Sequence, residues 1–358
     1  MFLERLLNKI GVLPYLRRRW RDDQQRSSDK VEARFDRHMA TVAARFERID
    51  QRLDDLPRAP ADTGERLRVL EQGLKTLTRR SHQLRVALRF NAEHRERRHG
   101  SQVFDEAPVA RHVAVAIDRA RLDTDPMAHL VVDALMPPEI YDALVDAIPP
   151  VELFTDKDEH KQNFKLHSFD VAPEWTLTAL GFMEDVLIPR IIVPGLLQKF
   201  EAHVRATYVR KYGAALGAQV AALPHIATAG RLMLRRPGYH LDPHLDPDRV
   251  VVTCLIYFAR PGDDESFGTS FYRIEGDPVI DRRNTFFPGN EGYCCHLVKT
   301  APFRPNTAVA FVNAGGAHGA DIPSSAPAGT ERYAYQFYVS PEPTALAALI
   351  PSTSGSVE

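Results

Sequence analysis

Cysteine is scarce in this sequence, with three residues among 358. Cys294 and Cys295 are adjacent, so a bond between them would be strained, and Cys254 lies inside an apolar run. A disulfide framework is therefore excluded. The economical interpretation is reduced thiols in a cytoplasmic protein.

Long hydrophobic runs are also missing. No stretch approaches the roughly 18 uninterrupted apolar residues of a membrane-spanning helix. Residues 1–16 are apolar but contain Glu4, Arg5 and Lys9, and they lack the small-residue cleavage site of a signal peptide. We expect residues 1–27 to be an amphipathic segment packed on protein. Contact of residues 1–20 with a membrane surface is the less favoured alternative.

Net charge is nearly absent from the whole chain but not from its parts. The sequence carries 46 Lys and Arg against 47 Asp and Glu. Residues 1–100 hold 24 of the bases and 15 of the acids, a net charge of +9. Residues 101–358 hold the remaining 22 and 32, a net charge of −10. Two differently built halves are indicated, and the acidic larger part gives no strong nucleic-acid signal.

Two heptad patterns predict an α-helical coiled-coil region over residues 28–98, broken near residues 57–64. Apolar residues from Phe35 to Leu56, and again from Leu67 to Leu88, alternate spacings of four and three with few exceptions. Prolines between the two seams end or kink the helix. The narrow seams favour either a homo-oligomer through this region or a hairpin within one chain. Two amphipathic helices packed on the rest of the protein are a third arrangement.

A globular domain is expected over residues 111–345, between a linker at 99–110 and a flexible tail at 346–358. Residues 137–148 predict a helix. Later, short segments rich in β-branched and aromatic residues follow one another between Pro- and Gly-containing turns, at residues 231–235, 250–258, 269–274, 293–298, 307–312 and 333–339. Such a series predicts an antiparallel sandwich or barrel with the earlier helices on an outer face.

The stretch at residues 238–246 carries the chemistry. It contains His-x-Asp twice, as His240/Asp242 and His244/Asp246. In an extended chain, residues two apart project to the same face, so one imidazole and one carboxylate can reach one ion. A second imidazole from a distant strand would complete a set of two histidines and one carboxylate. That set leaves three coordination positions open and suits non-haem Fe(II).

His318 is the candidate for the distant imidazole. It follows an apolar strand, is surrounded by small residues, and lies 72 positions after Asp246. His296 is a rival, 50 positions after the same residue. Fourteen residues beyond His318, Arg332 begins a predicted strand, where a guanidinium can hold a carboxylate through two parallel hydrogen bonds.

This ordered set resembles the Fe(II)- and 2-oxoglutarate-dependent dioxygenases, specifically their prolyl-4-hydroxylase-like branch. The resemblance covers about residues 230–340 and includes Pro243-His244-Leu245-Asp246, Thr253 to Tyr257, Gly268 to Phe271, His318-Gly319 and Arg332. It implies a mainly β catalytic domain, a double-stranded β-helix or jelly roll with flanking helices. The helical coiled-coil region would precede this domain.

The resemblance also implies residue roles. His244, Asp246 and His318 would be the catalytic residues and the iron ligands, and Arg332 would bind the distal carboxylate of 2-oxoglutarate. O₂ is the oxidant, and ascorbate is a further candidate cofactor. The family couples decarboxylation of 2-oxoglutarate, to succinate and CO₂, with hydroxylation of a second substrate. That substrate could be a small molecule, a glycan, a lipid or a protein side chain.

Which basic residue contacts 2-oxoglutarate stays open. The spacing from His318 to Arg332 is longer than is usual in these enzymes. Relatives often carry a cosubstrate-binding tyrosine nine residues before the first ligand histidine, where this chain has Arg235. Arg231, on the same face, adds another cation, and either could instead form a surface salt bridge. Tyr257 is also a candidate. Tyr257 and Thr253 are an even number of residues apart, so their side chains share one face of the strand, which is either the face toward the site or the face toward the helices.

Other functions compete with a hydroxylase. One alternative is a coiled-coil scaffold or binding protein with a non-catalytic jelly roll, which the complete ligand set disfavours. A cupin-like metal enzyme would not need Arg332. The His240/Asp242 pair is read as a polar turn or a substrate contact. The long loop between Gly276 and Gly292 is a candidate lid, with possible substrate contacts at Arg282, Arg283 and Phe286.

Overall fold

The computed structural model describes five stretches of the chain, residues 63–94, 104–155, 158–165, 171–276 and 284–350. The chain divides into two compact units, residues 1–78 and 79–358. The predicted amphipathic segment and the first heptad seam lie outside the described residues. No described helix combines the length and apolar character needed to cross a membrane.

Helix α4 (Thr63–Glu93) is continuous and contributes its last turns to the second unit. Val86, Ala87 and Phe90 are buried in the main hydrophobic core. The side chain of Asn91 accepts a hydrogen bond from the backbone N–H of Glu174. These turns were predicted to lie in a coiled-coil region outside the globular domain. They belong to its core because one face of the helix is apolar.

The predicted linker at residues 99–110 also differs, because α5 (Glu106–Arg119) begins inside it. Asp105 caps this helix by accepting a hydrogen bond from the N–H of Ala107. Its apolar residues recur every fourth position, and three of them are buried, namely Val109, Val113 and Ile117. This periodicity, rather than the surrounding polar composition, decides the local structure.

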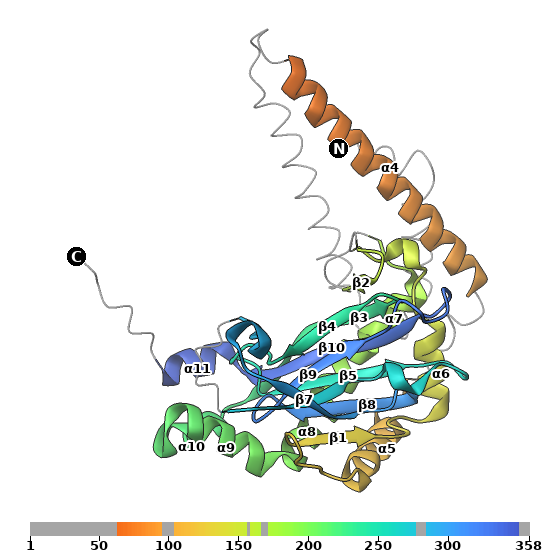
Figure 1. Ribbon diagram of the computed structural model, residues 1–358. Coiled ribbons are helices and arrows are strands. Elements are labelled where there is room, and N and C mark those ends of the chain that lie inside the picture. Colours follow the sequence, from red (N-terminus) through yellow and green to blue (C-terminus); the bar gives the residue numbers. More distant parts are fainter. Residues whose placement is uncertain (1–62, 95–103, 156–157, 166–170, 277–283, 351–358) are drawn as a thin grey trace. The chain divides into compact units, whose positions relative to one another are not determined.

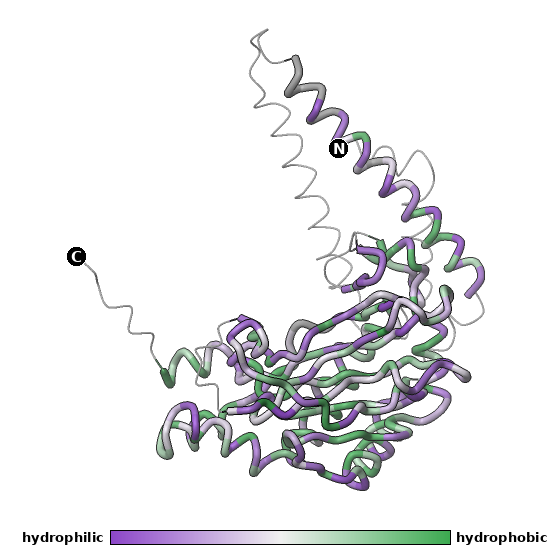
Figure 2. Tube along the Cα trace, in the orientation of Figure 1, coloured by the Kyte–Doolittle hydropathy of each residue, from purple (hydrophilic) through white to green (hydrophobic). Residues whose placement is uncertain are grey.

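The main core lies between the helices and the outer face of the larger sheet. In Figure 2 many hydrophobic residues, coloured green, lie on the strands and on the helices packed against them. The helical elements are α6 (Pro138–Asp146), η3 (Val151–Leu153), α7 (Glu174–Phe182), the π-helical segment η4 (Met183–Ile192), α8 (Val193–Lys199), α9 (Glu201–Tyr212), α10 (Ala214–Ala221) and α11 (Pro343–Leu349). Short 3₁₀ turns η5 (Glu265–Phe267) and η6 (Pro288–Glu291) interrupt the later loops.

The strands form two antiparallel sheets, with the orders β1-β8-β5-β10-β3-β2 and β4-β9-β6-β7. Their bounds are β1 (His129–Val132), β2 (Lys161–Phe164), β3 (His225–Arg235), β4 (His240–His244), β5 (Val252–Phe258), β6 (Ser270–Ile274), β7 (Cys295–Thr300), β8 (Pro305–Val312), β9 (Ala317–Asp321) and β10 (Arg332–Pro341). From β3 to β10 the chain passes repeatedly between the sheets, as in a jelly roll. The predicted antiparallel β domain with flanking helices is confirmed.

Side chains alternate between two environments along the larger sheet. On β10, the odd-numbered residues from Tyr333 to Val339 join the main core beside the helices. Ala334 instead joins a second apolar cluster between the sheets, with Tyr257 and Phe271. Because the side-chain period of a strand is two, Arg332, Gln336 and Tyr338 share the inward face of Ala334. The candidate site residues therefore project between the two sheets.

We expect Phe90→Ala to destabilise the second unit by about 3 kcal/mol or more, because it removes a buried aromatic ring. Leu88→Ala, on the same helix, should cost about 0.5 kcal/mol. The side chains are 7% and 38% exposed, respectively. Urea unfolding of the full chain measures both. Equal midpoints for the two variants would show that these turns of α4 lie outside the core.

Candidate metal centre

The two histidines meet because β4 pairs with β9 in the smaller sheet. His244, the last residue of β4, lies directly opposite His318. Their ring centroids are 4.1 Å apart. Residues opposite each other in an antiparallel pair project to the same face. Strand register therefore brings together side chains that are far apart in the sequence.

His244, Asp246 and His318 form a group that could hold a metal ion, and it is the one such group within the described residues. One ligand atom from each side chain lies within 4.8 Å of the others, and all three residues are buried. Nδ1 of His244 must donate to the carbonyl oxygen of Asp242, 2.9 Å away, which leaves Nε2 for a metal. Two imidazoles and one carboxylate suit Fe(II).

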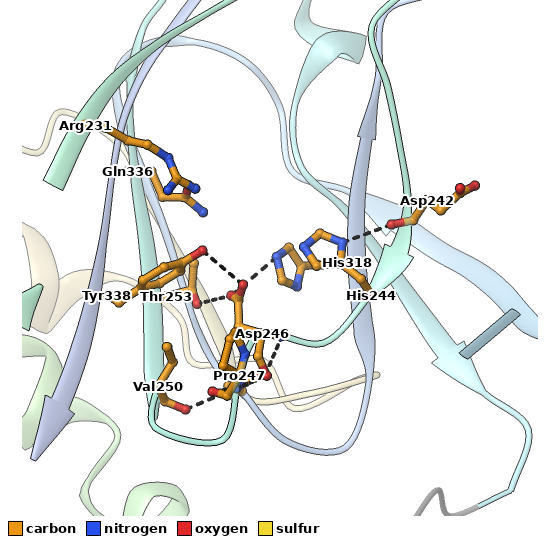
Figure 3. A network of polar contacts seen from close by, with 11 residues as sticks. Arg231, Asp242, His244, Asp246, Pro247, Val250, Thr253, His318, Gln336 and Tyr338 are labelled. Carbon is orange, nitrogen blue, oxygen red and sulfur yellow. Dashed lines mark hydrogen bonds and ion pairs between the residues drawn. The ribbon is translucent and has the colours of Figure 1, made fainter. Parts of the chain in front are cut away.

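The Asp246 carboxylate is oriented by two hydroxyl groups of the larger sheet (Figure 3). The Tyr338 hydroxyl donates to Oδ1 at 3.1 Å, and the Thr253 hydroxyl donates to Oδ2 at 2.5 Å. The two donors lie opposite each other on β10 and β5. Burial and the charge of Asp246 raise the pKa of Tyr338 to about 12, so it remains a donor at neutral pH. Oδ2 also lies 3.6 Å from Nε2 of His318.

Asn313 fixes the backbone of the turn that carries Asp246. Its Oδ1 accepts from the N–H of Asp246 at 3.1 Å. Its Nδ2 lies within 3.2 Å of the carbonyl oxygens of Asp246, Pro247 and Val250. The sequence interpretation assigned no role to this residue. The available signal in the sequence was the position of Asn313, an amide side chain directly after an apolar strand.

Burial keeps both imidazoles neutral. It lowers the pKa of His318 to about 3, with a further lowering contribution from neighbouring His244. Burial likewise lowers the pKa of His244. Neutral imidazole is the form that binds a metal ion, so the site requires no deprotonation of histidine at pH 7.

Arg332 is a buried cation without an acidic partner among the described residues. It is 2% exposed. Its Nε donates to the carbonyl oxygen of Phe267, and its Nη2 is buried without a hydrogen-bond partner. The guanidinium carbon lies 5.2 Å from the centre of the Tyr257 ring. Such a group fits a carboxylate of a bound ligand, which would satisfy the remaining donor.

The other predicted cosubstrate residues differ in their surroundings: Arg235 is bonded to a neighbouring strand, whereas Tyr257 and Arg231 face the interior. Arg235 donates to the backbone carbonyl of Gln162 and to the side chain of Asn163, so neighbouring β2 occupies its guanidinium. Burial lowers its pKa. Tyr257 faces the interior, where its hydroxyl donates to Thr269 at 2.7 Å. Arg231 also lies on the inward face and donates to Oε1 of Gln336.

The second His-x-Asp pair and the rival histidine lie apart from this group. His240 is exposed between Asp242 and Asp321, 2.9 Å from a carboxylate oxygen of each. Hydrogen bonds to Asp321 and then to Asp242 raise its pKa. His296 is exposed and pairs with Glu275. Both histidines are therefore engaged with surface carboxylates.

Part of the predicted lid contacts the ligand segment. Phe286 exchanges backbone hydrogen bonds with Leu245, which lies between the two ligands of the His-x-Asp motif. The Phe287 ring lies 5.5 Å from the His244 ring. Arg282 and Arg283 lie outside the described residues. The sequence interpretation named Phe286 but not the aromatic neighbour beside it.

Comparisons with known proteins give structural similarities at low identity. No protein-family model matches the sequence, and no curated protein matches it. A prolyl hydroxylase from Trichoplax adhaerens, in complex with a hypoxia inducible factor peptide fragment, is 12% identical with a TM-score of 0.37, and the match covers 67% of this chain and 91% of that one. A Pseudomonas putida prolyl-4-hydroxylase is 16% identical with a TM-score of 0.33, covering 64% and 99%.

A third similar structure is HygX from Streptomyces hygroscopicus with nickel, 2-oxoglutarate and hygromycin B bound. It is 13% identical with a TM-score of 0.32, and the match covers 60% of this chain and 82% of that one. These scores are low. The distances and hydrogen bonds among His244, Asp246 and His318, rather than these similarities, define the ligand set.

We expect His318→Gln to weaken the acid dependence of stability in the metal-free protein. An unfolded histidine binds a proton near pH 6.5, whereas folded His318 does so only near pH 3. The unfolded state therefore binds more protons between these values, and the free energy of unfolding falls as pH falls. From pH 7 to pH 5 this histidine accounts for a loss of about 2 kcal/mol, which the variant should lack.

Urea unfolding with EDTA at both pH values measures this difference. The matched control is His82→Gln, because His82 is an exposed histidine on α4. It should retain the wild-type loss. An unchanged loss in His318→Gln would contradict the assignment of a buried, neutral imidazole.

Proposed function

We propose that this protein is an Fe(II)- and 2-oxoglutarate-dependent oxygenase of the prolyl-4-hydroxylase-like type, which hydroxylates a substrate and releases succinate and CO₂. The observation that carries the proposal is the buried group of His244, Asp246 and His318 between two sheets that also enclose the unpaired cation Arg332. The ordered sequence motifs support the same assignment.

The donor set fits the metal that this reaction requires. Two neutral nitrogens and one carboxylate oxygen would hold iron and leave positions for a chelating cosubstrate and O₂. When bound, iron and 2-oxoglutarate supply an oxidative decarboxylation that inserts one oxygen atom of O₂ into a substrate C–H bond. Tyr338 and Thr253 would keep the Asp246 carboxylate in the orientation required of a ligand.

Arg332 would bind the distal carboxylate of 2-oxoglutarate. The cation is already desolvated, so a bound carboxylate restores interactions that burial removed. Tyr257 lies against the guanidinium and would form one wall of this subsite. Phe311, with its ring centroid 4.4 Å from that of His318, shields the metal side from water.

The alternative functions account for fewer of these features. A scaffold with a non-catalytic jelly roll would not require three buried ligands and an unpaired buried arginine. A cupin-like metal enzyme would use the ligands but leave Arg332 without a purpose. Self-association through residues 28–98 and a cytoplasmic location stay predictions.

The purified full chain with Fe(II), ascorbate and O₂ should convert 2-oxoglutarate to succinate, slowly when no substrate is added. His244→Ala and Asp246→Ala should reduce succinate to the level without enzyme, because each removes a metal ligand. Arg273→Gln is the control, since Arg273 is exposed and paired with Asp125. Circular dichroism checks that all variants fold. Retained turnover in both ligand variants would defeat the assignment.

Arg332→Gln should raise the KM for 2-oxoglutarate at least about tenfold, because a charged hydrogen bond to a carboxylate contributes about 1.5–3 kcal/mol. Affinity for Mn(II), used in place of iron and measured by water-proton relaxation, should change by less than about twofold, a difference under 0.5 kcal/mol. An unchanged KM would show that the cosubstrate binds elsewhere.

A further inference from the structure

Arg231 is an inward-facing arginine that lies closer along the sheet to the metal ligands than Arg332 does. It pairs in register with Gln336 on β10. Gln336 is two residues from Tyr338, whose hydroxyl contacts Asp246. At about 3.3 Å per residue, this separation is only about 7 Å along the strand. Arg332 lies four residues further from the metal ligands.

Arg231 faces the site because it alternates with inward-facing Met233 on β3, and a β-bulge lies just before it. On β10, Gln336 and Tyr338 are two residues apart, but their partners Arg231 and Thr228 are three apart on β3. One extra residue on β3 therefore precedes Arg231, and the register from Arg231 to Arg235 is regular. The bulge includes Gly230, where a Cβ would lie 2.5 Å from the Tyr335 hydroxyl. A larger residue at this position would require the Tyr335 side chain to shift.

The Arg231 guanidinium has unused hydrogen-bonding capacity. Its Nη2 donates to Oε1 of Gln336, whereas Nε is buried without a hydrogen-bond partner. Its carbon lies 5.8 Å from the centre of the Tyr338 ring. In Figure 3 the guanidinium and the Gln336 amide lie on the side of the network occupied by the Tyr338 hydroxyl. Among the described residues, Arg231 forms no ion pair with a carboxylate.

Counting charges shows that the interior holds more cations than the metal ligand Asp246 and the cosubstrate would balance. A divalent metal with Asp246 carries one net positive charge, and Arg332 carries another. These two charges balance the two carboxylates of 2-oxoglutarate and leave Arg231 and Arg235 without an acidic partner among the described residues. Arg235 already donates to neutral oxygens of Gln162 and Asn163, whereas Nε of Arg231 is unused. A partly buried cation and its free Nε favour one further carboxylate, which a guanidinium binds through two parallel hydrogen bonds. A phosphate more often meets several cations or a helix N-terminus.

We propose that Arg231, with Gln336 and Tyr338, binds a carboxylate of the substrate, so that the molecule hydroxylated is a carboxylate-bearing one. This inference rests on the proposed function. Arg231 lies one inward-facing position along the sheet from Tyr338, which contacts the ligand Asp246. It would hold the carboxylate there and so position a neighbouring C–H bond for oxidation. It contacts substrate, whereas Arg332 contacts cosubstrate.

The test uses propionate and the neutral, similarly shaped propionamide as probes. The full chain is loaded with Mn(II) and saturated with 2-oxoglutarate, so that the Arg332 subsite is filled and no turnover occurs. Mn(II) broadens the NMR lines of a molecule bound near it. We expect selective broadening of propionate over propionamide. Arg231→Gln should weaken propionate binding at least about tenfold, equivalent to 1.4 kcal/mol.

Two further variants sharpen the result. Arg273→Gln should bind propionate like the wild type, because Arg273 is exposed and paired with Asp125. Arg231→Lys keeps the charge but loses the planar fork, so it should restore only part of the affinity. If Arg231→Gln does not fold, the lysine variant and the comparison of the two probes on the wild type show whether Arg231 recognises a carboxylate.

Several outcomes overturn the inference. Equal broadening of both probes, or unchanged propionate binding in Arg231→Gln, would show that no carboxylate is recognised there. Broadening of methyl phosphate without propionate would identify a phosphate site instead. An increase in the KM for 2-oxoglutarate in Arg231→Gln as large as in Arg332→Gln would make Arg231 a cosubstrate residue. Failure of the proposed function itself is distinct, because iron would then produce no succinate at all.

Discussion

The antiparallel pairing of β4 with β9 is the constraint on which the rest of the site depends. It sets His244 against His318, and a slip of one residue in either strand would turn one imidazole to the opposite face of the sheet. Apolar packing between the sheets maintains this register, since Phe271 of β6 also lies opposite His318 and is fully buried. The approach of His244 to His318 is thus a consequence of strand pairing and register.

Asp246 needs separate support because it lies just beyond the end of β4. Asn313 holds its backbone from the end of β8, while Tyr338 and Thr253 hold its carboxylate from the larger sheet. The third ligand therefore links both sheets. Two neutral imidazoles and one carboxylate in a buried setting form a donor set that could hold a cation.

The polar side chains on the inward face of the larger sheet lie at successive positions along the strands, at increasing distance from the metal ligands. Tyr338 and Thr253 lie at the level of the ligands, Arg231 and Gln336 lie one inward-facing position along, and Arg332 lies two inward-facing positions beyond Gln336. Apolar side chains around Phe271 fill the spaces between these polar groups. In the proposed function, this layering would place a metal and two anionic groups at different positions, since each strand supplies an inward side chain at every second residue.

Sequence alone determined the antiparallel β domain and the residue types of the metal group, because period-two patterns and the His-x-Asp spacing are local properties. It also supplied Arg332 and Tyr257 as candidates. The resemblance selected His244/Asp246 from the two His-x-Asp pairs. Tertiary structure decided how this pair meets His318, because only strand pairing joins segments 72 residues apart. It also moved the last turns of α4 into the core. The separate surroundings of Arg231, Arg235 and Arg332 depend on contacts with neighbouring strands and loops, which no single segment encodes.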